Sequence, residues 1–329
     1  MPPARIRATG SYVPRKRLTN LDLEKMVDTS DEWITTRTGI RERRIAGPAE
    51  ACSDLALKAS KRALKAGGVK AADLDLIIVA TVTPDTFVPS AACVLQSKLG
   101  ASRAAAFDVN AACSGFIYAL SVADSFIRSG KCLNVLVVGS EVLSRVTNWQ
   151  DRSTCVLFGD GAGAALLGPA SDETFQSRII SVNIYADGNM GDLLMIPAGG
   201  SRRPASEDTL KNRLHCLQMS GNETFKIAVK TLESLVRNTL GAAGLTPSDI
   251  SLFVPHQANL RIIRATAERL GIPIDKVAVN IDRLGNTSAA SIPIALDEAV
   301  RSGRVKSGDY VLLEAFGGGL TWASALLRW

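Results

Sequence analysis

The chain has 329 residues, 46% hydrophobic and 21% charged, which is an ordinary composition for a globular protein with a sizeable core. Its formal charge is +6, and we find no apolar run of about 20 residues, no secretory leader and no basic run with interleaved aromatic residues, which argues against membrane, secreted and nucleic-acid-binding proteins. We expect a cytoplasmic protein whose positive charge either keeps its surface soluble or attracts an anionic partner.

Short apolar runs at 74–82, 133–138 and 310–314 predict buried parallel strands. Between the first two of these runs, apolar residues recur at helical spacing from Phe116 to Ile127, and the pattern stops at Gly130. The alternation of strands and helices predicts an α/β fold with parallel strands.

The chain also resembles itself. Segment 68–73 (GVKAAD) precedes one strand-like run, and 244–249 (GLTPSD), 176 positions further on, precedes another. Segments 126–131 and 299–304, which are 173 positions apart, both lead into strand-like runs. Chance similarity would explain two such matches, but their constant order favours a duplicated unit of about 175 residues.

The duplication predicts two halves, 1–175 and 176–329, that form one compact unit. A shift of 173 places Cys113 on Asn286, and each lies in a small-residue stretch before a helix. Two helix N-termini would then face one another near the carboxyl ends of strands, where ligands of α/β sheets bind.

Six scattered cysteines form no CxxC pair and give no metal-ligand spacing, which indicates a reduced, intracellular protein without a metal site. Cys113 lies between a strand-like run and a helix. A helix N-terminus favours thiolate over thiol, so we expect a nucleophile there rather than a buried structural cysteine.

His256 follows the strand-like run 250–254 in a polar loop and is the better site candidate of the two histidines. His215 lies in 213–218, which resembles a strand, and we expect it to be structural. Asn286 is either a helix cap or a partner of Cys113. The glycines at 317–319 form either a tight turn or an oxyanion hole of backbone N–H groups.

Taken together, six segments resemble the β-ketoacyl-acyl-carrier-protein synthase III family of thiolase-fold condensing enzymes. They are 38–43 (TGIRER), 110–115 (NAACSG), 158–163 (FGDGAG), 255–259 (PHQAN), 285–290 (GNTSAA) and 317–322 (GGGLTW). The resemblance runs almost end to end and implies duplicated βα halves in a layered α-β-α-β-α sandwich.

The resemblance also implies a site. Cys113 would be the nucleophile beside His256 and Asn286, and the amides of Cys113 and Gly318 would form the oxyanion hole. The implied positions that bind coenzyme A (CoA) are Thr29, Trp33, Arg37, Arg152 and Asn259.

Arg261 and Lys226 would dock the acidic carrier protein. Phe87 would reach across a homodimer towards the partner's acyl pocket.

The implied reaction joins an acyl-CoA primer to malonyl-acyl carrier protein by decarboxylating condensation, through an acyl-cysteine, and starts fatty acid synthesis. No permanently bound cofactor is implied. The alternatives are a related acyltransferase of secondary metabolism with the same three residues, a thioester hydrolase and a non-catalytic CoA-binding protein.

A hydroxymethylglutaryl-CoA synthase would need a glutamate base, for which Glu141 is available, although the overall pattern argues against it. Glu314, before the glycine loop, is expected to be either a supporting group with a raised pKa or half of a salt bridge. Primer length is not readable from the sequence. Segment 198–211 is expected to be a mobile surface loop.

Overall fold

The computed structural model describes residues 2–170 and 177–329 and contains two main sheets. The first sheet has the order β1 (Ala4–Tyr12), β7 (Asp160–Pro169), β6 (Val135–Val142), β4 (Leu76–Ala80) and β5 (Ala105–Val109). The second has the order β11 (Leu252–Pro255), β12 (Tyr310–Gly317), β13 (Thr321–Arg328) and β8 (Arg178–Ala186).

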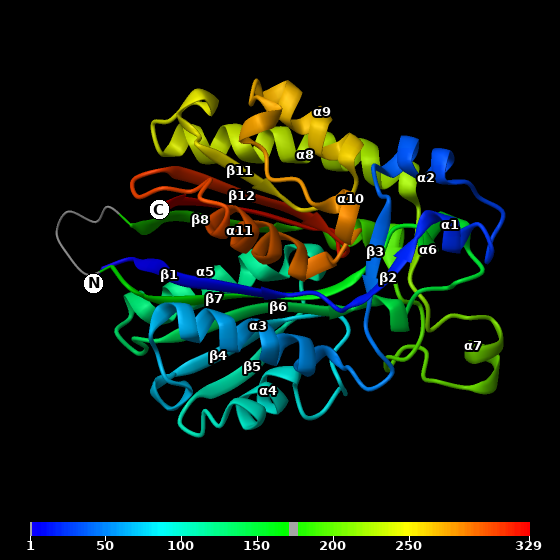
Figure 1. The fold of residues 1–329 in the computed structure, drawn as a ribbon, viewed down its shortest axis with the longest axis horizontal. Coiled ribbons are helices and arrows are strands. Elements are labelled where there is room, and N and C mark those ends of the chain that lie inside the picture. Colours follow the sequence, from blue (N-terminus) through cyan, green and yellow to red (C-terminus); the bar gives the residue numbers. More distant parts are fainter. Residues whose placement is uncertain (1, 171–176) are drawn as a thin grey trace.

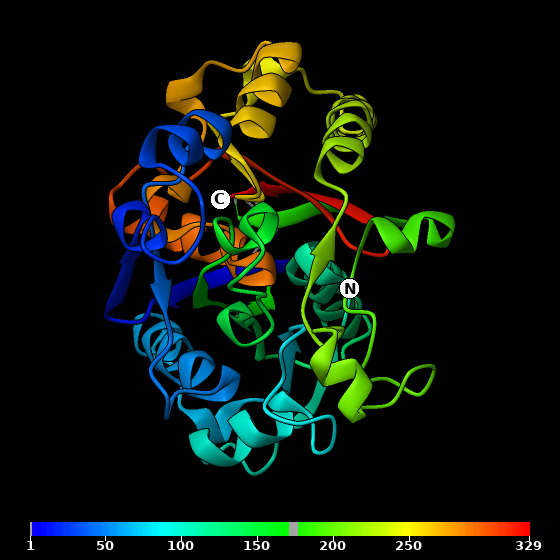
Figure 2. The same cartoon turned by 90° about the vertical axis from the view of Figure 1, so that its right-hand side faces the viewer.

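Three layers of helices cover these sheets (Figure 1). The outer layers are α3 (Cys52–Gly67) with α4 (Ala91–Leu99), and α8 (Gly221–Ala242) with α9 (Leu260–Leu270). Between the sheets lie α5 (Gly115–Arg128) and α11 (Ser291–Arg301). Figure 2 shows the same layers end-on, and the predicted α-β-α-β-α sandwich is confirmed.

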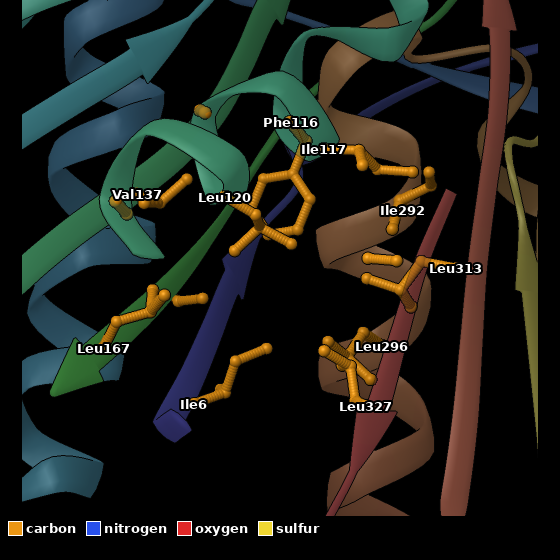
Figure 3. Packing of buried hydrophobic residues seen from close by; sticks show 14 of the residues in the cluster. Ile6, Phe116, Ile117, Leu120, Val137, Leu167, Ile292, Leu296, Leu313 and Leu327 are labelled. Carbon is orange, nitrogen blue, oxygen red and sulfur yellow. The ribbon is translucent and has the colours of Figure 1, made fainter. Parts of the chain in front are cut away.

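The central layer is apolar because α5 and α11 touch a sheet on each side (Figure 3). Phe116 and Leu120 of α5 are fully buried, as are Leu296 of α11 and Leu313 of β12. Burying each such side chain contributes roughly 1.5–3 kcal/mol. The central pair therefore anchors both sheets.

The remaining elements lie mostly at one end of the sandwich (Figure 1). They are β2 (Lys16–Thr19), α1 (Asn20–Leu23), α2 (Asp31–Thr38), β3 (Glu42–Ile45), α6 (Arg152–Cys155), β9 (Leu194–Met195), α7 (Glu207–Lys211), β10 (Gln218–Met219) and α10 (Ile281–Leu284). None of the helices in the described ranges is long and apolar enough to cross a bilayer.

The strand order confirms the predicted duplication. Both β1-β7-β6-β4 and β8-β13-β12-β11 run through two antiparallel pairings and then a parallel one. The predicted parallel strands are found, because β4 pairs with β5 and β6, and β11 with β12, in parallel, while β1 and β7, like β8 and β13, make each sheet a mixed one. The predicted boundary between residues 175 and 176 lies outside the described residues.

The predicted register of the repeat is wrong by three residues at the centre. Helix α5 follows the short 3₁₀ helix η2 (Ala112–Ser114), and α11 follows η7 (Ser288–Ala290), 176 positions later. Ala112 and Ser288 both have a positive φ, of 45° and 47°. Because α11 has 11 residues and α5 has 14, segments beyond these helices match at 173 instead. Asn286 therefore corresponds to Asn110, not to Cys113.

Two further expectations need correction. Segment 213–218 is mostly a turn, and only Gln218–Met219 (β10) is a strand. His215 lies in that turn and lines neither of the two main cavities. Segment 198–211 is mostly exposed, as expected, but it is not a loop throughout, because it ends in helix α7, whose first turn is capped by Ser206.

A substitution at Gly139 of β6 would test the close contact between the two halves. A Cβ there would lie 2.2 Å from the carbonyl oxygen of Ala289, so Gly139→Ala should cost about 1–3 kcal/mol of unfolding free energy through overpacking. Gly241→Ala, in α8 with open space around it, is the matched control and should be neutral or stabilising. Denaturant unfolding measures both, and equal midpoints would contradict the predicted contact.

Candidate active site

Cys113 lies in η2, directly before α5, and is buried. Backbone N–H groups in this first turn have no acceptor within the helix and are available to a ligand. Ala112 adopts its positive φ immediately before the thiol, which turns the chain sharply from the strand into the helix. Cys113 is thus held at the end of β5, as predicted.

The expected thiolate is not found in the free protein. Burial raises the pKa of the Cys113 thiol to about 12, partly offset by a hydrogen bond with Ser288, so burial outweighs the helix N-terminus. The resting group is a neutral thiol, and attack on a substrate requires its proton to leave.

His256 follows β11 and is buried, with its backbone N–H bound to the Glu314 carbonyl at 2.7 Å. Its Nδ1 lies 2.6 Å from Ser291 Oγ, which also accepts the Gln257 N–H at 3.4 Å. The structure shows no other acceptor for the Ser291 hydroxyl hydrogen, so we infer that it is donated to Nδ1, which leaves the ring proton on Nε2. Burial lowers the pKa of His256 to about 3, so the ring is a neutral hydrogen-bond donor.

Hydrogen bonds hold both the side chain and the backbone of Asn286. Its Oδ1 accepts the Ser288 N–H at 2.8 Å, which leaves Nδ2 to donate. Its backbone N–H donates to Leu157 O at 2.8 Å, and its carbonyl accepts the Gly159 N–H at 3.0 Å. The site therefore has two neutral donors, His256 Nε2 and Asn286 Nδ2.

Buried Arg43 supports the Asn286 loop from behind. Its guanidinium donates to Val156 O at 2.7 Å and to Asn20 Oδ1 at 2.9 Å. A Cβ on Gly285 would lie 3.1 Å from the Arg43 Cβ, and one on Gly159 would lie 2.2 Å from Leu284 O. These contacts hold the loop that carries Asn286 against Arg43 and the turn at Gly159.

The glycine loop lies against Cys113. A Cβ on Gly317 would lie 2.7 Å from the Cys113 nitrogen, so only glycine permits this approach. Gly318, the predicted oxyanion donor, lines a cavity together with Cys113.

Two cavities meet at Cys113. The larger, of about 650 Å³, is also lined by His256, Asn286 and Glu314. The smaller, of about 390 Å³, is mainly apolar, and its lining includes Leu143, Phe158, Leu194, Ile196 and Leu217. A group bonded to the sulfur thus has one space on each side.

Two buried glutamates lie near this junction. The carboxyl group of Glu314 has no hydrogen bond or ion pair among the described residues, and burial raises its pKa to about 8, which favours the first of its two predicted roles over a salt bridge. Glu141 accepts hydrogen bonds from Thr83 Oγ1 (2.6 Å), Thr81 Oγ1 and Val82 N, and burial raises its pKa to about 7. It lines neither cavity, which does not fit a base that acts directly on a substrate.

Three of the positions predicted to bind CoA, Trp33, Arg37 and Asn259, line the larger cavity, and the other two, Arg152 and Thr29, do not. The guanidinium carbons of Arg37 and Arg152 lie 4.9 and 5.0 Å from the Trp33 ring centroid. Thr29 does not line the cavity, and its buried hydroxyl has no partner among the described residues.

Lys226 and Arg261 also line the larger cavity and are exposed, and Arg261 lies 5.6 Å from the Phe225 ring centroid. Phe87 lies outside both cavities and is 83% exposed.

Sequence reasoning missed Ser288 and Ser291. Both lie in a small-residue stretch where serine usually caps a helix, and only the folded chain shows that Ser288 lines the smaller cavity with Cys113 and that Ser291 contacts His256.

Family models match two parts of the chain. The 3-oxoacyl-[acyl-carrier-protein] synthase III model matches residues 107–188, and its C-terminal model matches 240–329. A β-ketoacyl-[acyl-carrier-protein] synthase III from Caldanaerobacter subterraneus is 57% identical over 326 residues, which cover 99% of this chain and 98% of that protein. The protein of the same name from Roseiflexus castenholzii is 55% identical over the same shares.

Solved structures agree with these matches. A 3-oxoacyl-[acyl-carrier-protein] synthase III from Aquifex aeolicus has a TM-score of 0.91 at 52% identity and covers 99% of this chain and 100% of that one. The priming β-ketosynthase of the R1128 polyketide pathway has a TM-score of 0.90 at 40% identity and covers 98% and 96%.

The hydrogen-bond network at His256 predicts its titration. With only two histidines in the chain, ¹⁵N NMR should resolve the His256 ring. We expect the Nε2–H tautomer from pH 8 down to pH 5, because burial holds its pKa far below this range. Ser291→Ala should mix the tautomers, whereas a wild-type ring that titrates near pH 6.5 would contradict the assignment.

Proposed function

Because the chain belongs to the 3-oxoacyl-[acyl-carrier-protein] synthase III family, we propose that it carries out the decarboxylating condensation of an acyl-CoA primer with malonyl-acyl carrier protein at Cys113, His256 and Asn286. The product is β-ketoacyl-acyl carrier protein, which starts fatty acid synthesis. The observation that carries this proposal is that a buried thiol and two neutral donors line one cavity.

In the first half-reaction, Cys113 attacks the acyl-CoA thioester. The tetrahedral oxyanion is held by the N–H groups of Cys113 and Gly318, whose loop lies against the thiol. CoA leaves through the larger cavity, and the acyl chain occupies the smaller, apolar one.

In the second half-reaction, malonyl-acyl carrier protein enters the larger cavity and loses CO₂. His256 Nε2–H and Asn286 Nδ2–H donate to the enolate oxygen, and the carbanion attacks the acyl-cysteine. No base is needed, because decarboxylation itself generates the carbanion. The two neutral donors therefore suit the step better than a charged acid–base pair.

The surroundings of the larger cavity supply binding. Trp33, Arg37 and Arg152 present an aromatic ring and two cations to the nucleotide of CoA, with Thr29 behind them, and Asn259 lines the path of the pantetheine arm. Lys226 and Arg261 stand exposed at the same cavity for the acidic carrier protein. Acyl-CoA is thus a substrate, and no permanently bound cofactor takes part.

We further infer a homodimer in the cytoplasm. Phe87 and Val88 are neighbours in one loop, and both apolar side chains are exposed. In a dimer, Phe87 would reach the partner's acyl pocket. All six cysteines are unpaired, as suits a reducing compartment.

A related priming acyltransferase of secondary metabolism is the second candidate, because the R1128 ketosynthase shares the fold at 40% identity. The higher identity of 55–57% to proteins named β-ketoacyl-[acyl-carrier-protein] synthase III favours the first role.

The nucleophile is tested by intact-protein mass spectrometry after brief incubation with a panel of acyl-CoAs. We expect one acyl group on the Cys113 peptide, which malonyl-acyl carrier protein then discharges to a β-ketoacyl product. Cys113→Ala should abolish labelling, whereas Cys93→Ala, at an exposed thiol, should not. Labelling that persists in Cys113→Ala would contradict the assignment, and an acyl-enzyme that water discharges before malonyl-acyl carrier protein is added would indicate a hydrolase.

The donor role of Asn286 is tested by Asn286→Asp, which keeps an acceptor for the Ser288 N–H but removes the Nδ2–H donor. We expect CO₂ release from malonyl-acyl carrier protein to fall about 10²–10³-fold, as for other oxyanion donors. Acylation of Cys113 in the same variant is the control and should persist. Equal losses in both half-reactions would show a structural role instead.

A further inference from the structure

The proposed cycle, on which this inference rests, leaves one proton without an acceptor. The Cys113 thiol must lose a proton when it forms the acyl-cysteine, and the sulfur must regain one when the product leaves. His256 cannot hold this proton at neutral pH, because burial lowers its pKa to about 3. The cycle therefore needs a further group that can bind and release a proton and that is reached from the cavities at Cys113.

Glu314 is the only aspartate or glutamate among the described residues that lines either cavity. Its exposed fraction is 1%, and neither of its carboxyl oxygens has a hydrogen-bond partner within residues 2–170 and 177–329. Buried polar groups in folded proteins nearly always have partners. A buried carboxyl group without one, in a cavity that Cys113 also lines, therefore indicates a place where water or a substrate group binds.

Strand β12 turns the Glu314 side chain towards this cavity. Successive residues of a strand point to opposite faces of the sheet. Leu313 and Ala315 lie in the core between the two sheets, where Figure 3 shows Leu313 close to α11. Glu314 and Phe316 consequently point to the other face, and both line the larger cavity.

Helices α8 and α9 cover this face of the sheet (Figure 1). The buried side chains that they bring to the larger cavity are Ala228, Leu232, Ile263 and Thr266. Thr266 is the polar one, and its hydroxyl group, like the Glu314 carboxyl group, has no hydrogen-bond partner among the described residues. Two such groups on one cavity of about 650 Å³ suit a bridging water molecule, which typically makes about three hydrogen bonds.

The other charged groups of the surrounding helices do not face Glu314 from a buried position. Those that line the larger cavity are exposed cations, namely Arg37 of α2, Lys226 of α8 and Arg261 of α9. The rest of the charged residues on α8 and α9 lie outside the cavity; Glu233 pairs with Arg237 and Arg269, and the others are exposed, namely Glu223, Lys230, Arg264 and Glu268.

The neighbouring strands add no charge at this position. Pro255 of β11 and Ser324 of β13 lie opposite Glu314, and the Ser324 hydroxyl group lies 2.7 Å from that of Thr239. The other buried glutamate, Glu141 of β6, lines neither cavity. Among the described residues, Glu314 is thus the acid that the cavity presents to Cys113.

We propose that Glu314 takes up the proton of Cys113 during acylation and returns it to the sulfur during condensation, in both cases through water in the larger cavity. Glu314 acts on the sulfur through that water and touches neither reacting carbon. The role needs a carboxyl group that is buried but unpaired, because a salt bridge would hold it in the ionised form.

The steps balance. In acylation, the thiol proton passes through water to the Glu314 carboxylate while the sulfur bonds the acyl carbon. The bond from that carbon to the CoA sulfur then breaks, and the CoA thiolate takes a proton from bulk water. In condensation, CO₂ leaves, the carbanion bonds the acyl carbon, and the bond to Cys113 breaks. Protonated Glu314 then returns its proton through water to the Cys113 sulfur. One solvent proton is consumed per turnover, on CoA.

The two half-reactions should depend on pH with opposite signs, because acylation needs Glu314 ionised and condensation needs it protonated. Burial raises the pKa of Glu314 to about 8. The ionised fraction of a single group with that midpoint rises about tenfold between pH 7 and pH 9. The acylation rate should therefore rise about tenfold over this range, and the condensation rate should fall about tenfold.

The test measures each half-reaction alone, by rapid quench and intact-protein mass from pH 6 to pH 10. The first is acylation of Cys113 by acyl-CoA, and the second is discharge of the preformed acyl-enzyme by malonyl-acyl carrier protein. Glu314→Gln should lose both pH dependences and slow acylation at pH 9 and condensation at pH 7 about 10²-fold, as when acid–base catalysis is removed. Glu141→Gln, at a buried carboxyl group outside both cavities, is the matched control and should keep both profiles.

Glu314→Leu separates this role from a structural one. Replacing a buried, unpartnered carboxyl group with an apolar side chain of similar size should leave the denaturant midpoint of unfolding unchanged or raise it. The same variant should lose both pH dependences, like Glu314→Gln. A protein that is at least as stable but has lost them would show that Glu314 serves the reaction rather than folding.

Opposite pH profiles that persist in Glu314→Gln and Glu314→Leu would overturn the proposal, as would their loss in Glu141→Gln alone. Slower half-reactions at every pH with unchanged midpoints would overturn it too, because a structural role gives that result. If Glu314→Gln does not fold, as judged by circular dichroism, Glu314→Leu decides. If the wild type is not acylated at any pH, the proposed function itself fails.

Discussion

The close approach of the two halves at the centre of the sandwich is the contact on which the site depends. Gly139 of β6 lies so near Ala289 that a Cβ would come within 2.2 Å of its carbonyl oxygen, and Gly115 brings the start of α5 against the same residue. This contact brings η2 and η7 together, and with them Cys113 of one half and Asn286 and Ser288 of the other. The duplicated fold thus creates a site that neither half contains alone.

Burial then determines what chemistry this site performs. The same low-dielectric surroundings raise the pKa of the thiol and of both glutamates and lower that of His256, so the resting groups are mostly neutral. Neutral donors fixed by Ser291 and Ser288 need little reorganisation when charge develops on a substrate oxygen. A site of this kind stabilises transient anions but must move protons through defined contacts.

The sequence predicted the positions of Cys113 and His256 well, because each follows an apolar strand and precedes a polar or small-residue turn. Asn286 was matched to Cys113 by applying an incorrect offset between the two repeats. Helix α11 is three residues shorter than α5, and the apolar pattern of the sequence does not reveal this difference in length. The prediction of a thiolate at the helix N-terminus was wrong for a physical reason. The dipole is a local property of the chain, whereas burial depends on which distant segments pack around the thiol. Ser288 and Ser291 were missed because their contacts, too, are tertiary.

The junction of two cavities at one sulfur imposes an order on the reaction. An acyl group on Cys113 that enters the smaller, apolar cavity vacates the larger one, which His256 and Asn286 line. The second substrate therefore meets its two donors only after the first leaving group has departed along the same path. In the proposed reaction both substrates arrive on a pantetheine arm, so the larger cavity would serve both steps, and the acyl-cysteine would keep the primer in place between them. The branching at Cys113 thus explains why a covalent intermediate suits this site better than simultaneous binding of both thioesters.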